Sequence, residues 1–302
     1  MPKVQANGIE LFYDEHGDPS APPLLLVMGL GMQLLGWDER FVRLLAGRGF
    51  RVIRFDNRDT GLSTHLDGVR SHLKEVMDGD PSQAPYRLSD MARDAVGLMD
   101  ALGIDSAHVV GASMGGMIVQ TLAIEHPRRV RSLCSIMSTT GARNVGGATR
   151  EAMAILMAPP GTDRESVLAR AVVTHSVIGS KAYPVGEEVV RARAAAAFDR
   201  AFYPEGFARQ LAAIRAGPDR TPALRTVSVP TLVIHGEDDT LVLPSGGDAT
   251  AAAVPGAMLL RLPGMAHDFP EPLWPRIVDA IAENAVGAER ARAQSAGAEK
   301  KL

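Results

Sequence analysis

One serine in this chain stands in a setting typical of an activated nucleophile. Ser113 is the central residue of Gly111-Ala-Ser-Met-Gly115, a Gly-x-Ser-x-Gly pattern. The apolar run 107–110 before it predicts a strand, and residues 114–126 behind it show a helical pattern. A sharp strand-to-helix turn strains the serine backbone and lifts the hydroxyl clear of the sheet. The positive end of the helix then lies where an oxyanion would form. The pattern therefore predicts that Ser113 is the nucleophile of an acyl transfer.

A serine hydroxyl is a weak nucleophile and needs a general base, which must come from the eight histidines of the chain. His267 fits best, because it lies in the loop 263–267 directly after the apolar run 257–262. The carboxyl ends of parallel strands form the edge at which open α/β folds bind ligands. His235 also ends an apolar run, 231–234, but we expect its imidazole to pack or hydrogen-bond beside its neighbours.

The base in turn needs an acid that fixes its tautomer. The strand predicted at 231–234 ends in His235-Gly-Glu-Asp-Asp239, and spacing alone leaves Asp238 and Asp239 equally possible. Either one gives the chain order serine, acid, histidine, which is the order expected when the nucleophile stands on a strand–turn–helix elbow.

A tetrahedral oxyanion needs two backbone donors. One should be the N–H of Met114, the residue after the nucleophile. The other should come from Gly29-Leu-Gly31, the loop that follows the apolar run 24–28, where glycine permits tight turning.

The elements that must position these groups alternate along the chain. Apolar runs that predict strands lie at 9–13, 24–28, 51–55, 107–110, 130–137, 231–234 and 257–262. Helical patterns between them lie at 91–102, 114–126 and 273–283. This alternation predicts an α/β fold with a mostly parallel central sheet flanked by helices.

The alternation stops between residues 141 and 224. This stretch is rich in Ala and Arg, is punctuated by prolines and reads as helices only. We therefore expect a helical insertion, a lid over the sheet, with residues 1–140 and 225–285 forming the core. The tail 286–302 contains almost no large apolar residue and is predicted to be partly disordered.

Composition narrows the classes of partner. The 302 residues are 46% hydrophobic and 22% charged, and the net charge of −3 supplies no strong field for nucleic acid or an anionic membrane. The single cysteine, Cys134, excludes an intrachain disulfide. No signal-peptide stretch is present, and no run approaches the roughly 18 apolar residues that span a bilayer. We expect a cytoplasmic protein without stable membrane association.

Five motifs together carry a family resemblance. They are Leu-Val-Met-Gly at 26–29, Asp-Asn-Arg-Asp-Thr-Gly-Leu-Ser at 56–63, and the segments 111–115, 235–239 and 263–267. With them the chain, from about Val4 to Ala285, resembles the α/β-hydrolase fold serine hydrolases and is similar to the aclacinomycin methylesterase-like esterases. The resemblance implies an α/β-hydrolase fold with a helical lid, and a carboxylic ester hydrolase that needs no metal or organic cofactor.

The resemblance also selects residues. It implies that the acid is Asp239, three residues after the glycine that ends its strand, and that the second oxyanion donor is the N–H of Leu30. Much of the superfamily has histidine where this chain has Met28, so a supporting side chain of the oxyanion loop is missing. The segment 56–63 braces this loop in relatives, and Asp59 replaces their usual glycine.

We further expect Asp56 and Arg58 to pair locally. The substrate pocket is expected to be apolar and adaptable, because methionines flank the predicted site loops and occur in the lid. Its candidate lining residues are Gly29, Met32, Met153, Met157 and Met265, although each of these methionines could instead fill a gap in the core.

The expected substrate is a small-molecule carboxylic ester, including bulky apolar or polyketide-like esters and lactones, and the expected protein is a monomer or homodimer. A carbon–carbon bond hydrolase and a cofactor-free perhydrolase remain alternatives, since both would use the same triad. An alternative of another class is a non-catalytic ligand receptor on the same fold. The sequence leaves the physiological substrate open.

Overall fold

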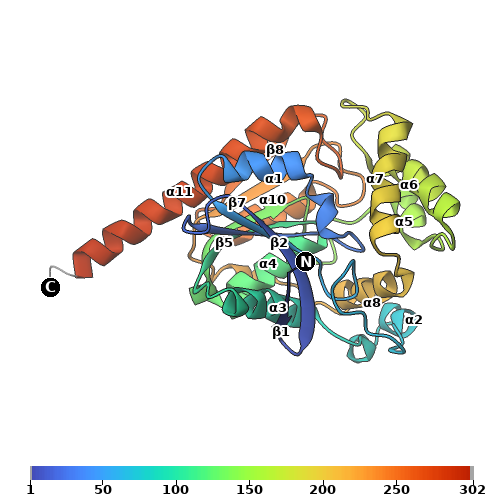
Figure 1. The fold of residues 1–302 in the computed structure, drawn as a ribbon, viewed down its shortest axis with the longest axis horizontal. Coiled ribbons are helices and arrows are strands. Elements are labelled where there is room, and N and C mark those ends of the chain that lie inside the picture. Colours follow the sequence, from blue (N-terminus) through green and yellow to red (C-terminus); the bar gives the residue numbers. More distant parts are fainter. Residues whose placement is uncertain (1, 300–302) are drawn as a thin grey trace.

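The computed structural model describes residues 2–299 and is built around an eight-stranded sheet in the order β1-β2-β4-β3-β5-β6-β7-β8 (Figure 1). The strands are β1 (Lys3–Ala6), β2 (Ile9–His16), β3 (Pro23–Val27), β4 (Arg51–Phe55), β5 (Ala107–Ala112), β6 (Val130–Ile136), β7 (Thr231–Gly236) and β8 (Met258–Leu262). The pairs from β4 through β8 are parallel, and β2 pairs antiparallel with both β1 and β4. The predicted mostly parallel sheet is confirmed.

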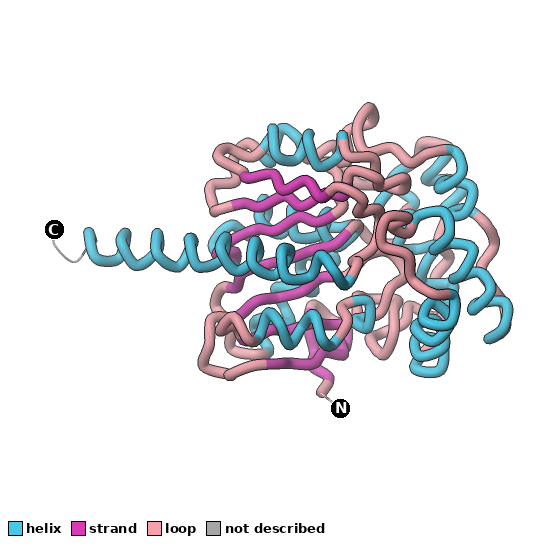
Figure 2. Tube along the Cα trace, turned by 90° about the horizontal axis from the view of Figure 1, so that it is seen from above, coloured by secondary structure: helices cyan, strands magenta, loops and turns pink. Residues whose placement is uncertain are grey.

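Helices cover both faces of this sheet (Figure 2). They are α1 (Glu39–Ala46), α2 (Leu73–Met77), α3 (Leu88–Ala101), α4 (Met114–Glu125), α5 (Arg150–Met157), α6 (Arg164–Ile178), α7 (Glu187–Arg200), α8 (Pro204–Arg215), α9 (Thr221–Leu224), α10 (Ser245–Ala253) and α11 (Trp274–Glu299). Short 3₁₀ turns occur at Leu34–Gly36, Pro81–Gln83, Pro127–Arg129 and Glu271–Leu273. No helix within the described residues is both long enough and apolar enough to cross a membrane.

Two apolar layers hold the helices to the sheet. Successive side chains of a strand point to opposite faces, so β3 buries Leu25 and Val27 in the layer under α3 and α4. Leu24 and Leu26 enter the other layer, under α1 and α11. A strand buried on both faces is apolar at most positions, which explains the nearly continuous apolar runs in the sequence.

The helices α5 to α8 lie between β6 and β7 in the chain, and we call them the cap. Both views place them together on one side of the sheet, away from the outer end of α11 (Figures 1 and 2). They occupy the stretch for which the sequence predicted helices only.

The C-terminal segment differs from the expectation. Residues 286–299 belong to the 26-residue helix α11, whereas the sequence predicted partial disorder for 286–302. The segment consists mainly of Ala, Arg and Glu, which have high helix propensity, and Glu289 lies 3.3 Å from both His108 Nε2 and Arg131 Nη1. Residues 300–302 of the predicted tail lie outside the described residues.

Candidate active site

The turn from β5 into α4 holds Ser113 in a backbone conformation that side chains rarely adopt. Its φ is 56° and its ψ is −118°, which confirms the strained strand–turn–helix setting. The two glycines of the motif make the turn possible. A Cβ on Gly111 would lie 2.1 Å from the carbonyl oxygen of Gly115, and one on Gly115 would lie 2.0 Å from that of Val27. The chain therefore passes so closely on either side of the serine that only glycine fits.

The structure brings Ser113 together with two of the other predicted site residues. His267 Nε2 lies 3.0 Å from Ser113 Oγ, and His267 Nδ1 lies 2.8 Å from Asp239 Oδ2. Each residue follows the carboxyl end of a different parallel strand, namely β5, β7 or β8. Asp239 is 1% exposed, so its carboxylate acts on the imidazole with little screening by solvent.

Backbone donors fix the direction of the Asp239 carboxylate. Its Oδ1 accepts the N–H groups of Leu241 and Val242, each at 2.9 Å, which leaves Oδ2 for His267. Asp238, the alternative that spacing left open, is exposed, and its backbone N–H donates to the Met265 carbonyl at 3.0 Å. The choice of Asp239 thus agrees with the geometry.

The loop that carries His267 is held by the end of cap helix α6. The His267 N–H donates to the Ile178 carbonyl at 2.9 Å, and the Ala266 N–H donates to Ser180 Oγ at 2.8 Å. Ser180 in turn donates its N–H and its hydroxyl to the Asp268 carboxylate. Sequence reasoning missed Ser180 and Asp268, because no local pattern links a cap residue to a loop so far along the chain.

The electrostatics of the site suit His267 as a base. Burial lowers the pKa of His267, but the charge and hydrogen bond of Asp239, together with the nearby Asp268, outweigh burial, so its pKa is raised above the ordinary value. Burial dominates at His235 and lowers its pKa. His235 Nε2 bonds to the Val242 carbonyl at 2.8 Å, as expected of a residue that packs beside the site.

The loop Gly29–Gly31 lies against the nucleophile. A Cβ on Gly29 would stand 3.0 Å from Ser113 Cβ. Among the described residues, no hydrogen bond is made by the N–H of Leu30 or by the N–H of Met114. Neither N–H is thus taken by an acceptor within the described residues, which is what the predicted role of an oxyanion donor requires.

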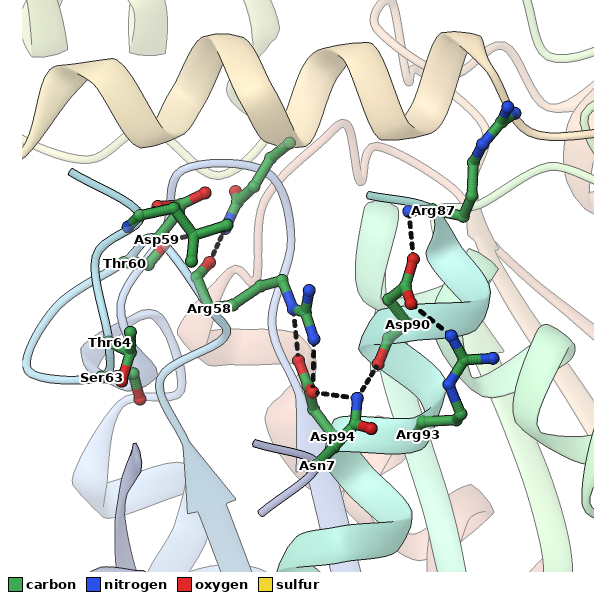
Figure 3. A network of polar contacts seen from close by, with 12 residues as sticks. Asn7, Arg58, Asp59, Thr60, Ser63, Thr64, Arg87, Asp90, Arg93 and Asp94 are labelled. Carbon is green, nitrogen blue, oxygen red and sulfur yellow. Dashed lines mark hydrogen bonds and ion pairs between the residues drawn. The ribbon is translucent and has the colours of Figure 1, made fainter. Parts of the chain in front are cut away.

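The predicted pairing of Asp56 with Arg58 is wrong. Asp56 forms an ion pair with Arg200 of the cap, with Nη1 and Oδ2 2.7 Å apart. Arg58 makes a two-point contact with Asp94 of α3, at 2.6 and 2.7 Å, and Asp94 also accepts from Asn7 Nδ2 at 2.9 Å (Figure 3). Asp56, Arg58 and Asp94 are buried, and Asp56 and Arg58 find their counter-charges on different elements, the cap and α3.

The segment 56–63 is hydrogen-bonded to the residues that flank the oxyanion loop. Asn57 Nδ2 donates to the Met28 carbonyl at 2.9 Å, and Asp56 Oδ1 accepts the Leu34 N–H at 2.7 Å. Both bonds restrain the chain on either side of Gly29–Gly31, which is the bracing that the resemblance implied.

A cavity of about 1760 Å³ opens over Ser113 and His267. This exceeds the roughly 300–1,000 Å³ of typical small-molecule pockets. Of the candidate lining residues, Gly29, Met32 and Met153 line the cavity. Two candidates do not: Met157 is 38% exposed at the end of α5, and Met265 is fully buried in the layer under α11. Within residues 2–299, no group of three or more His, Cys, Asp or Glu side chains could hold a metal ion.

Comparison with known proteins places this geometry in context. A family model described as the alpha/beta hydrolase fold matches residues 22–271. The chain is 28% identical over 289 residues to the rhodomycin D methylesterase DauP of Streptomyces sp. (strain C5), covering 88% of this chain and 92% of that protein. It is 29% identical over 240 residues to a 2-hydroxy-6-oxononadienedioate/2-hydroxy-6-oxononatrienedioate hydrolase of Paraburkholderia xenovorans (strain LB400), covering 78% of this chain and 76% of the relative. The crystal structure of the enol-lactonase from Burkholderia xenovorans LB400 matches with a TM-score of 0.71 at 27% identity, over 96% of this chain and 100% of that chain.

Proposed function

The chain belongs to the alpha/beta hydrolase fold family, and from this premise we propose that it hydrolyses a carboxylic ester through an acyl-enzyme on Ser113. The observation that carries the proposal is the hydrogen-bonded series Ser113 Oγ, His267 and Asp239, at 3.0 and 2.8 Å. Each distance is within the range over which a general base takes a proton from a nucleophile. The methylesterase and enol-lactonase relatives support an ester or lactone as the bond attacked.

The proposed reaction has two steps. His267 Nε2 takes the hydroxyl proton as Ser113 Oγ attacks the ester carbonyl carbon, and the N–H groups of Leu30 and Met114 stabilise the oxyanion. The carbon–oxygen bond to the alcohol then breaks, and His267 returns the proton to the leaving oxygen. Water, deprotonated by the same imidazole, next attacks the acyl carbon. The bond from this carbon to Ser113 Oγ then breaks, His267 returns the proton to Oγ, and the acid leaves. Asp239 keeps Nδ1 protonated and stabilises the imidazolium in both steps.

The size of the cavity supports a bulky substrate. Its roughly 1760 Å³ would hold a polycyclic or long-chain ester, and the methionines Met32 and Met153 among its lining supply the adaptable apolar surface that such a substrate needs.

A panel of short aryl esters, methyl esters of polycyclic acids and macrolactones tests the proposal when the native chain is compared with Ser113→Ala. The variant should lose about 10⁴- to 10⁶-fold in kcat, and an organophosphorus fluoride should label Ser113 in the native chain alone. Equal ester turnover by the two proteins would refute the proposed mechanism. A native chain that neither reacts with the probe nor turns over any ester would favour the non-catalytic receptor.

A second candidate is hydrolysis of a carbon–carbon bond by the same three residues. It is favoured by the relative from Paraburkholderia xenovorans, whose named substrate is an oxo-dienedioate and contains no ester. A vinylogous diketone, offered beside an aryl ester of similar size, separates the two reactions. The ester proposal predicts the larger kcat/KM for the aryl ester.

A further inference from the structure

We propose that Gln210, on cap helix α8, is a positioning residue that holds the oxyanion loop Gly29–Gly31 in its working geometry. The inference rests on the proposed function and extends it, because it makes a side chain of the cap part of the machinery that stabilises the transition state.

Both polar atoms of the Gln210 amide form hydrogen bonds, one with the oxyanion loop and the other with the segment 56–63. Oε1 accepts the Gly31 N–H at 2.7 Å, while Nε2 donates to the Arg58 carbonyl at 2.8 Å and to Thr60 Oγ1 at 2.7 Å. The orientation of the amide is forced, because the Gly31 N–H can only donate and the Arg58 carbonyl can only accept. The side chain is fully buried, so any of these groups left unpaired would carry a desolvation penalty.

The helix that carries Gln210 is itself fixed against the segment 56–63. Arg209 makes a buried two-point ion pair with Asp59, with Nε to Oδ2 and Nη2 to Oδ1 both at 2.9 Å. A Cβ on Gly206 would lie 2.0 Å from the Asp59 carbonyl oxygen, so the two backbones are in direct contact. Asp59, which stands where relatives usually have glycine, therefore anchors α8. Arg58 is anchored in its turn by Asp94 (Figure 3).

Two side chains of α8 lie against Gly31. Besides its bond to Gln210, it takes a φ of 68°, and a Cβ there would lie 2.8 Å from the ring of Phe207. Leu30, which directly precedes Gly31, provides the proposed oxyanion donor. Met28, at the opening of the loop, has no side-chain N–H with which to support it. Gln210 Oε1, which accepts the Gly31 N–H, instead supports the loop from the cap.

The expected kinetic signature is specific. The oxyanion exists only in the transition state, so a displaced Leu30 N–H lowers kcat and kcat/KM together and leaves KM nearly unchanged. A loop shift of about 1 Å can cost on the order of 100-fold. We therefore expect Gln210→Met to lower kcat by about 10- to 100-fold, with KM within about twofold of the native value.

Gln33 offers a matched control. It is also buried, and it also ties the loop region to the cap through three hydrogen bonds, to the carbonyls of Ala197 and Ala201 and from Arg200 Nη1, at 2.7, 2.8 and 2.7 Å. Gln33→Met thus removes as many contacts between the same two parts of the chain, but none of them reaches Gly31.

The experiment measures kcat and KM on the best aryl ester, together with inhibition by an alkyl trifluoromethyl ketone and by the corresponding alcohol. Ser113 Oγ adds to the ketone carbon and its proton passes to His267, so the ketone oxygen becomes an oxyanion at the loop; the alcohol cannot form this adduct. Gln210→Met should lose ketone affinity in proportion to kcat/KM and keep its alcohol affinity, whereas Gln33→Met should keep the ratio of the two affinities. If both variants change KM and leave the ratio at its native value, Gln210 is only structural and the proposal is overturned.

A second variant keeps the test decisive if Gln210→Met does not fold. Gln210→Glu retains the acceptor for the Gly31 N–H, and burial favours its protonated carboxyl, whose O–H can donate to the Arg58 carbonyl in place of Nε2. Its kcat should therefore stay within about threefold of native, and a tenfold loss in a folded protein contradicts the proposal. Thermal unfolding and far-UV circular dichroism establish which variants fold. A native chain with no ester turnover would instead refute the proposed function, which separates the two failures.

Discussion

Replacing Asp239 by asparagine should lower kcat about 10⁴-fold while leaving the fold in place. The structure dictates how the new amide must sit. The N–H groups of Leu241 and Val242 both point at the Oδ1 position at 2.9 Å, so the amide oxygen must stay there. The amide nitrogen then takes the Oδ2 position, 2.8 Å from His267 Nδ1.

That orientation reverses the polarity of the hydrogen bond to the base. The amide donates to Nδ1, so the neutral imidazole must carry its proton on Nε2 and cannot accept the proton of Ser113. A wrongly set tautomer in such a triad costs about 10⁴ in kcat, or roughly 5.5 kcal/mol at about 1.4 kcal/mol for each factor of ten.

The matched control is Asp238→Asn. Asp238 is adjacent and exposed, and within residues 2–299 its side chain makes no hydrogen bond or ion pair. Steady-state kinetics on the best aryl ester should show native turnover for this variant, and thermal unfolding should show an intact fold for both. Asp239→Asn with more than a tenth of native kcat, or a comparable loss in Asp238→Asn, would refute the reasoning.

Three further outcomes are expected. The neutral imidazole is the base, and the pKa of His267 is raised above the ordinary 6.5. The value of kcat/KM should therefore fall as the pH drops through a midpoint above 6.5, and a pH–rate profile with a lower midpoint contradicts this. Arg209→Met leaves the buried Asp59 carboxylate unpaired, which should cost about 3–5 kcal/mol in urea denaturation; a loss under about 1 kcal/mol would argue against it. Gly115→Ala places a Cβ 2.0 Å from a backbone oxygen of β3 and should destabilise by about 1–3 kcal/mol or more, whereas Gly287→Ala, in open space on α11, should stabilise by up to about 1 kcal/mol.

Much of the fold and the nucleophile could be predicted from local pattern. The strand, turn and helix around Ser113 form one continuous stretch, and the close approach of its glycines depends on neighbours in the same stretch and on β3. His267 could be placed because it follows the last predicted strand. The choice between Asp238 and Asp239 could not be made from spacing, since it depends on which carboxylate meets the N–H groups of Leu241 and Val242.

Local reasoning failed where a partner comes from far along the chain. Asp56 and Arg58 are two residues apart, yet they pair with Arg200 and Asp94. Gln210 lies 179 residues from Gly31 and sits in an Ala-rich cap helix without a motif. The residues next to Gln210 in the sequence do not indicate that it contacts the oxyanion loop, because this contact depends on how the cap packs on the core.

The cap contacts the site at two places, the end of α6 and helix α8. The end of α6 fixes the loop of His267 through Ile178 and Ser180, and α8 fixes the oxyanion loop through Gln210. The two sets of contacts share no residue, so α6 positions the base and α8 positions the oxyanion loop. A displacement of the whole cap would break both sets and would also separate the buried pair Arg209–Asp59. Losing one partner of such a pair costs about 3–5 kcal/mol, so the buried pair opposes displacement of the cap. Ser113, its base and its oxyanion donors are all in place only when the cap is packed on the core.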